Sequence, residues 1–145
     1  MLFFAVPRLE RSLFAGDSKK VSRWILVNAG SLRDKAVQTQ KRYILNVDMD
    51  SDRFWISDEA MVEEDLPGAR EGGFELPDGQ KIIDVIYPGE KRISSGTAGI
   101  VFYPKGYSDR AIIHVQDNAG NRRSYCIEPF LPKVKIRDSY VEFKS

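Results

Sequence analysis

The stretch Leu2-Phe3-Phe4-Ala5-Val6-Pro7-Arg8-Leu9 opens the chain and decides how the rest of the sequence is interpreted. Its bulky apolar residues lead directly into a helical pattern, whereas the sequence from Tyr43 onward alternates with a period of two, which is typical of strands. We therefore expect a single α+β domain over residues 1–145. A helix over residues 1–38 would be followed by a β-rich head over residues 42–145.

The helical pattern consists of apolar residues that recur every three or four positions, which places them on one face. The members expected to pack the helix against the head are Leu13, Val21, Trp24, Ile25 and Leu32. Gly16-Asp17-Ser18 interrupts the pattern, because glycine is a poor helix former and Asp17 falls on the apolar face. The sequence leaves open a kink at this point, or a second helix that starts with Asp17 or Ser18 as its N-cap.

We interpret the apolar residues 1–6 as the last turns of a longer apolar segment, because bulky apolar residues seldom run directly from a chain start into a helix. Met1 would then be the start of a shortened form or an internal residue of a longer precursor. No segment of the sequence reaches the roughly 20 apolar residues that span a bilayer. In a longer parent helix, Pro7 would remove a hydrogen bond and produce a bend.

The composition allows one packed core but gives no general electrostatic signal. With 42% hydrophobic residues and 22 basic against 21 acidic side chains, no net field favours nucleic acid or an anionic membrane. The single cysteine, Cys126, excludes an internal disulfide, and the single histidine, His114, leaves no partner for a zinc site or a cysteine–histidine nucleophile. We expect no catalytic residue, no cofactor and no metal, and interpret His114 as a structural or surface residue.

Short alternating runs bounded by Gly or Pro predict the strands of the head. They fall at residues 43–49, 53–56, 81–87, 99–103, 110–116, 122–128, 134–137 and 140–143, the last two forming a final hairpin. The acidic stretch 58–78, with its prolines and glycines, is expected to be an irregular loop. Asp48, Asp50 and Asp52 stand at alternate positions, as calcium loops begin, but the glycine and closing glutamate are missing, which favours a solvated hairpin tip.

A group of basic residues on the last predicted strands is a candidate site for nucleic-acid binding. The group consists of Arg122, Arg123, Lys133, Lys135 and Arg137, with Tyr125 and Tyr140 nearby. Such a set could follow a phosphate backbone while the aromatic rings stack on bases. Because Glu128, Asp138 and Glu142 are interleaved with it, a balanced strand surface is the preferred interpretation and nucleic-acid binding the minority one.

Two motifs resemble the pilin superfamily, in particular the minor pseudopilins of type II secretion of the H type and the related FimT-like minor pilins of type IV pili. Residues 4–9, Phe-Ala-Val-Pro-Arg-Leu, are similar to the Ala-aliphatic-Pro segment of the family's N-terminal helix. Residues 100–108 are similar to its Phe-x-Pro-x-Gly signature, and 112–115 with 125–128 follow where the family has its closing strand pair. The prepilin-peptidase cleavage motif is absent, and residues 129–132 replace the usual Thr-Gly.

The resemblance implies a pilin-like α+β fold in which one long N-terminal helix packs on antiparallel sheets of a β-sandwich-like head. It also implies a non-enzymatic structural subunit of the periplasmic pseudopilus that drives protein export through the type II secretion system. Such a subunit is processed by a prepilin peptidase, methylated, anchored in the inner membrane by one N-terminal segment and assembled with other pseudopilins. The assembly helix would present Phe3, Phe4, Val6, Pro7 and Leu9.

The alternative that the resemblance leaves open is a FimT-like minor type IV pilin that binds extracellular DNA for uptake. Its nucleic-acid patch would be the basic group Arg122, Arg123, Lys133, Lys135 and Arg137. A small hydrolase is a third possibility, which is disfavoured because no nucleophile in the sequence can be paired with a general base.

Overall fold

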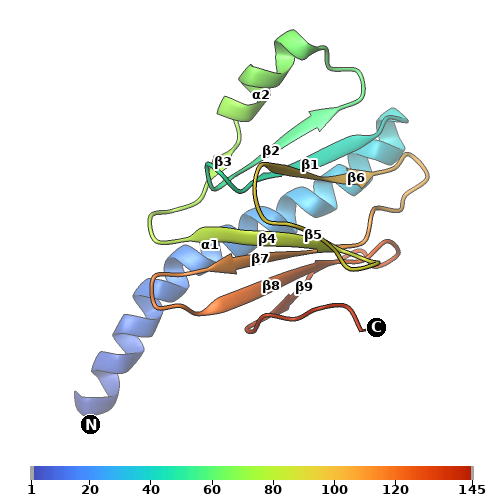
Figure 1. Ribbon diagram of the computed structural model, residues 1–145. Coiled ribbons are helices and arrows are strands. Elements are labelled where there is room, and N and C mark those ends of the chain that lie inside the picture. The colour runs from blue at the N-terminus through green and yellow to red at the C-terminus, as the bar shows by residue number, and fades with distance from the viewer. Residues whose placement is uncertain (1, 145) are drawn as a thin grey trace.

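The computed structural model describes the backbone of residues 2–144 and the side chains of residues 16–144. A long helix, α1 (Leu2–Thr39), comes first, and antiparallel strands follow it. Figure 1 shows both sheets lying on the same side of α1, with the N-terminal end of the helix projecting beyond them. This order of one long helix followed by antiparallel strands confirms the expected α+β class.

The strands form two antiparallel sheets. The first has the order β3-β2-β1-β6 and contains β1 (Tyr43–Asp48), β2 (Arg53–Asp58), β3 (Phe74–Glu75) and β6 (Thr97–Phe102). The second has the order β5-β4-β7-β8-β9 and contains β4 (Lys81–Tyr87), β5 (Lys91–Ile93), β7 (Ala111–Gln116), β8 (Arg122–Ile127) and β9 (Lys135–Arg137). The Tyr87 hydroxyl at the end of β4 donates to the Gly99 carbonyl on β6 (2.7 Å), which links the two sheets.

One face of α1 supplies a wall of the core to both sheets. Its residues Val21, Ile25, Ala29, Leu32 and Ala36 recur every three or four positions and are at most 4% exposed. They join a single cluster with buried residues of the first sheet, such as Phe54, and of the second, such as Tyr125. Since burying one large aliphatic side chain stabilises a fold by about 1.5–3 kcal/mol, this face holds the helix firmly on the head.

Helix α1 continues through Gly16-Asp17-Ser18, so the alternative of a second helix that starts at Asp17 or Ser18 is wrong. The helix ends where Gln40 adopts a left-handed backbone conformation with φ of 54°. The side-chain amide of Gln40 also donates to the Val37 carbonyl (2.6 Å), one of the carbonyls left open at a helix end. In the part of the chain that the structure describes, no helix is long and apolar enough to cross a membrane.

The stretch 58–78 differs from the irregular loop that the sequence predicts. It contains a short 3-10 turn, η1 (Glu63–Asp65), the helix α2 (Leu66–Glu71) and the strand β3. Acidic residues directly before a helix with proline in its first turn are a favourable start for a helix. The Arg53 guanidinium on β2 donates to the last carbonyls of α2, those of Arg70 and Glu71 (both 3.3 Å), and fixes α2 beside the sheet.

The strands differ from the expected ones in two further places. Strand β5 was not predicted; the chain turns back into it through Gly89 and Glu90, which have φ of 84° and 63°. The predicted hairpin of 134–137 with 140–143 is wrong, because β9 pairs with β8 and residues 140–143 form no strand. They cross the outer face of the second sheet, where the side chains of His114 and Ser124 contact the backbone carbonyl and amide of Val141.

Candidate functional site

The helix reaches each sheet through a separate contact within one turn. The Trp24 ring stacks on both Phe54 (5.3 Å between centroids) and Phe74 (5.5 Å) of the first sheet, which also lie close to each other (6.5 Å). Ser22 meets the second sheet, where its hydroxyl lies 2.9 Å from that of Tyr125. Burial raises the pKa of the Tyr125 hydroxyl, so it stays protonated and available for this bond. The turn at 22–25 is therefore where α1 is tied to both sheets.

A second tie lies further along the helix at Arg33. Its guanidinium donates to the carbonyl of Pro129 (2.8 Å) and that of Glu128 (3.1 Å), both just after β8. It also donates to the carbonyl of Gly106 (3.3 Å), in the loop between β6 and β7. Burial lowers the pKa of Arg33 below its usual value. Sequence reasoning missed this residue, although a cation between Ala29 and Ala36 on the apolar face was an available signal.

The predicted helix residues divide into two groups. Val21 and Ile25 are fully buried, Leu32 is 1% exposed and Trp24 is half-buried against the core. The remaining ones lie outside the described side chains: Phe3, Phe4, Val6, Pro7, Leu9 and Leu13. The expected bend at Pro7 falls in that same segment.

The face of α1 turned away from the head is not wholly polar. Val27 is 62% exposed and Leu26 is 39% exposed. Both lie between the two ties at residues 22–25 and at Arg33, so the head holds this part of the helix rigidly while leaving its outer side free. An exposed apolar strip on a firmly held helix is suited to contact with another helix.

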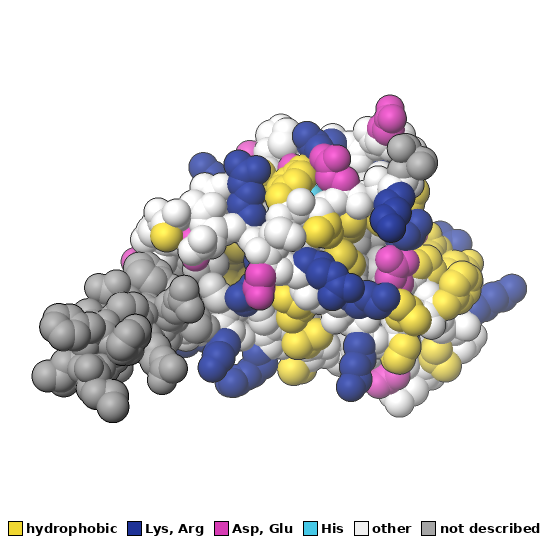
Figure 2. Space-filling model, turned by 90° about the horizontal axis from the view of Figure 1, so that it is seen from below, with side chains coloured by type: hydrophobic (Ala, Val, Ile, Leu, Met, Phe, Trp, Pro, Cys, Tyr) yellow, Lys and Arg dark blue, Asp and Glu magenta, His cyan; other side chains and the backbone are white. Residues whose placement is uncertain are grey.

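A second apolar patch lies at the end of the head that is remote from the N-terminus. Tyr107 stacks on Tyr103 (4.7 Å between centroids), and Phe130 lies 6.3 Å from Tyr107 while remaining 81% exposed. Figure 2 shows apolar side chains at this end of the molecule, interspersed with Lys and Arg. The loops that carry these rings are the ones that Arg33 holds.

The structure divides the predicted basic group between two faces. Lys135 and Arg137 on β9 oppose Cys126 and Ser124 of β8, and cross-strand partners lie on one face, the outer one, which also takes Arg122. Arg123 points the other way and donates to Ser22 of α1 (3.1 Å) and Asp138 (3.0 Å). Lys133 precedes β9 and is exposed. Arg122, Lys135 and Arg137 are therefore the members that share a surface.

The aspartates of the first hairpin have protein partners. Asp48 accepts the amides of Asp50 and Ser51 (both 3.2 Å) and pairs with Arg70 of α2 (2.7 Å). Burial works against ionisation of Asp48, but these hydrogen bonds and the ion pair outweigh it and lower its pKa. Asp52 accepts the amide of Ile82 (2.9 Å). The carboxylates of Asp48 and Asp52 thus tie the hairpin tip to α2 and β4.

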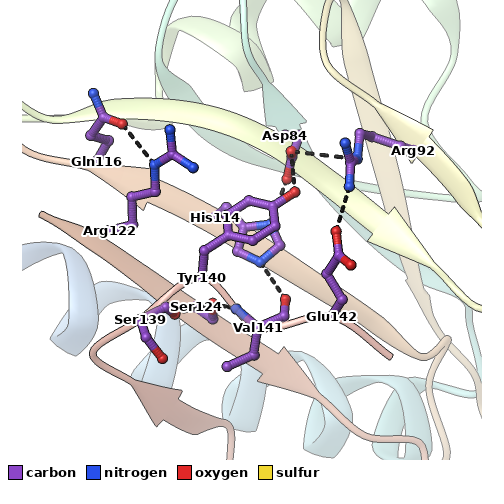
Figure 3. A network of polar contacts seen from close by, with 10 residues as sticks. All are labelled: Asp84, Arg92, His114, Gln116, Arg122, Ser124, Ser139, Tyr140, Val141 and Glu142. Atoms are coloured by element: carbon purple, nitrogen blue, oxygen red, sulfur yellow. Dashed lines mark hydrogen bonds and ion pairs between the residues drawn. The ribbon is translucent and has the colours of Figure 1, made fainter. Parts of the chain in front are cut away.

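The outer face of the second sheet contains a row of buried polar side chains. Asp84 on β4 is paired across the strands with His114 on β7, which is paired with Ser124 on β8. These three side chains are at most 3% exposed. Residues 138–144, which follow β9, are here called the C-terminal strap, and Figure 3 shows its residues 139–142 lying over the row. His114 is therefore a buried residue in a polar network that connects three strands to the strap.

Backbone groups of the strap bind this row directly. The Ser124 hydroxyl donates to the Ser139 carbonyl (2.6 Å) and accepts the Val141 amide (2.9 Å). Nε2 of His114 lies 2.7 Å from the Val141 carbonyl, and its Nδ1 contacts Asp84. Sequence reasoning missed this network, because the strap is far from these strands along the chain.

These features define a pilin-like fold: a long N-terminal helix with its inner face packed on antiparallel sheets. A solved structure with this arrangement is that of the minor pseudopilin EpsH from the Type 2 Secretion System of Vibrio cholerae. It matches with a TM-score of 0.56 over 79% of this chain and 98% of that chain, at 9% sequence identity. Comparison with protein-family models gave no match, and neither did comparison with curated proteins. The similarity confirms the expected fold and establishes the fold alone.

Proposed function

We propose that this protein is a minor pseudopilin, a non-enzymatic structural subunit of a periplasmic pseudopilus that drives protein export by type II secretion. The observation that carries the proposal is the long helix α1, which is tied to both sheets at residues 22–25 and projects beyond them at its N-terminal end (Figure 1). The similarity in fold to a minor pseudopilin supports it. The H type is part of the same proposal, supported by the motifs at residues 4–9 and 100–108.

In this function, one N-terminal segment, processed by a prepilin peptidase, anchors the subunit in the inner membrane, and the head lies in the periplasm. Phe3, Phe4, Val6, Pro7 and Leu9 belong to the assembly helix. The outer strip at Leu26 and Val27 extends the contact with neighbouring subunits as far as the head. Burial of apolar helix surface, at about 25 cal/mol per Å², would supply the cohesion of the fibre.

Site-specific photo-cross-linking in the native cells tests this function. A photoreactive amino acid in place of Val27 should cross-link the protein to other pilin-like subunits, because Val27 lies on the free side of α1. The matched control carries the same amino acid in place of Glu64, which is also exposed but lies on η1 and not on α1. Cross-links to pilin-like subunits that are equally abundant at both positions, or absent at Val27, would contradict the proposal.

A second candidate function is DNA uptake, which is favoured by the shared surface of Arg122, Lys135 and Arg137. Three phosphate contacts would give a salt dependence of binding with a slope of about −0.7 per contact on single strands. Filter binding over a salt series measures this slope for the wild type and for the triple alanine variant. Absence of binding at low salt, or equal binding by the variant, would discard DNA uptake through this surface.

A further inference from the structure

The row of Asp84, His114 and Ser124 has the properties of a binding site for an extended peptide. Buried polar groups on a sheet face require partners, and here a separate segment, the C-terminal strap, supplies them. We propose that this row is an exchangeable site, which the strap fills within its own chain and the strap of a second copy of this chain fills in an assembly. The proposal is independent of the secretion function.

The contacts define the ligand that the site accepts. The hydrogen bonds of Ser124 and His114 to the strap all involve its backbone groups, which any extended chain provides. Selectivity comes from Tyr140, whose ring stacks on His114 (3.6 Å between centroids) and whose hydroxyl donates to Asp84 (2.8 Å). It also comes from Glu142, which accepts from the Arg92 guanidinium (2.7 Å). The ligand is thus an extended segment with a tyrosine and, two residues later, a carboxylate.

Arginines around the row complement the charge and aromatic character of the strap. The Arg92 guanidinium lies 5.9 Å from the Tyr140 ring centroid, and that of Arg122 lies 5.5 Å from it on the other side. The Arg110 guanidinium lies 4.6 Å from the ring centroid of Phe143. Figure 3 shows Arg92 and Arg122 on opposite sides of Tyr140, with Glu142 pointing toward Arg92. A groove with cationic edges thus holds a strap of aromatic and acidic residues.

The strap is attached in a way that allows it to leave. It crosses the sheet instead of pairing with a strand, and none of its residues belongs to the apolar core described for residues 16–144. Tyr140, Val141 and Phe143 are half-buried and Glu142 is exposed. Release of the strap would therefore open no part of the core that α1 and the two sheets share.

The second copy is the occupant that fits best, because its strap would make the same contacts. The first two residues of the strap, Asp138 and Ser139, are exposed, so a change of backbone direction there can lead residues 140–144 outward. It would break the ion pair of Asp138 with Arg123 and release the Ser139 carbonyl from Ser124. Exchange of an identical element between copies is a low-cost route to assembly, since few new contacts have to be created. It would join heads to one another, apart from any helix contact at Val27.

Cross-linking between two single-cysteine chains tests the exchange. In a Cys126→Ser background, one chain carries Lys91→Cys beside the groove and the other carries Lys144→Cys on the strap, two exposed residues that line one cavity and leave the Arg92–Glu142 pair intact. An equimolar mixture treated with a short bismaleimide should give a cross-linked dimer that increases with protein concentration. A Lys81→Cys chain, altered at an exposed position on β4, replaces the Lys91→Cys chain in the control mixture. We expect about tenfold less dimer in that control, because dimer would arise there only from random encounters.

A single chain with both Lys91→Cys and Lys144→Cys measures whether the strap occupies the groove of its own chain. We expect an internal cross-link in this chain, and loss of the mixed dimer when Tyr140→Ala is added to the strap chain. An internal cross-link without mixed dimer above the control would overturn exchange, because the strap would then remain in its own chain. Absence of the internal cross-link would overturn the site itself.

Discussion

At the scale of single residues, Arg33 connects α1 to two loops of the head, the one that follows β6 and the one that follows β8. Replacing it with alanine removes three charge-assisted hydrogen bonds to carbonyls and should lower the free energy of unfolding by about 2 kcal/mol. Arg33→Lys should recover only part of this, because one ammonium group cannot reproduce the planar fork. Urea unfolding measures both, with exposed Lys35→Ala as the control. A loss no larger than that of the control would contradict the role of Arg33.

Tyr140 gives a residue-level prediction about pH. Burial, then the hydrogen bond to Asp84 and the charge of that carboxylate, raise the pKa of Tyr140 to about 12. The unfolded chain has a tyrosine pKa of about 10, so the stabilisation is complete below that pH and is lost as pH rises toward 12. Tyr140→Phe should therefore make the decline in unfolding free energy between about pH 9.5 and about pH 11.5 less steep than in the wild type. Equal declines in the two proteins would contradict the assignment.

At the scale of elements, the contact between α1 and the first sheet depends on Trp24. Trp24→Ala removes both ring stacks with Phe54 and Phe74 and should cost about 3 kcal/mol in unfolding free energy. Trp24→Phe keeps an aromatic ring against Phe54 and Phe74 and should cost about 1 kcal/mol in unfolding free energy. Urea unfolding compares the two, and equal losses would show that the stacked rings do not hold the helix.

The order of elements could be predicted from the sequence because the two periodicities are visible without tertiary information. Val21, Ile25 and Leu32 repeat at helical spacing, and the period of two begins at Tyr43. The path of residues 140–143 could not, because Tyr-Val-Glu-Phe alternates like a strand. Its actual position depends on Asp84 and His114, which are distant in sequence. The same holds for the candidate site: a helical pattern locates the inner face, whereas the loops that Arg33 binds are set by the tertiary fold.

At the scale of the whole molecule, the two sides of α1 differ. Its inner face closes the core of both sheets, while its outer strip at Val27 remains exposed. A substitution on the outer strip should therefore impair assembly without affecting folding. Val27→Asp should change the free energy of unfolding by less than about 0.5 kcal/mol, because it is a surface substitution.

The central claim, that this protein is a structural subunit of an export fibre, is tested most directly by complementation of a gene deletion in the native cells. The amount of protein exported by type II secretion is the measurement. We expect the deletion to stop export, the wild type to restore it, and Val27→Asp to fail although the variant is folded and present at normal levels. Export that continues in the deletion strain, or full restoration by Val27→Asp, would contradict the account.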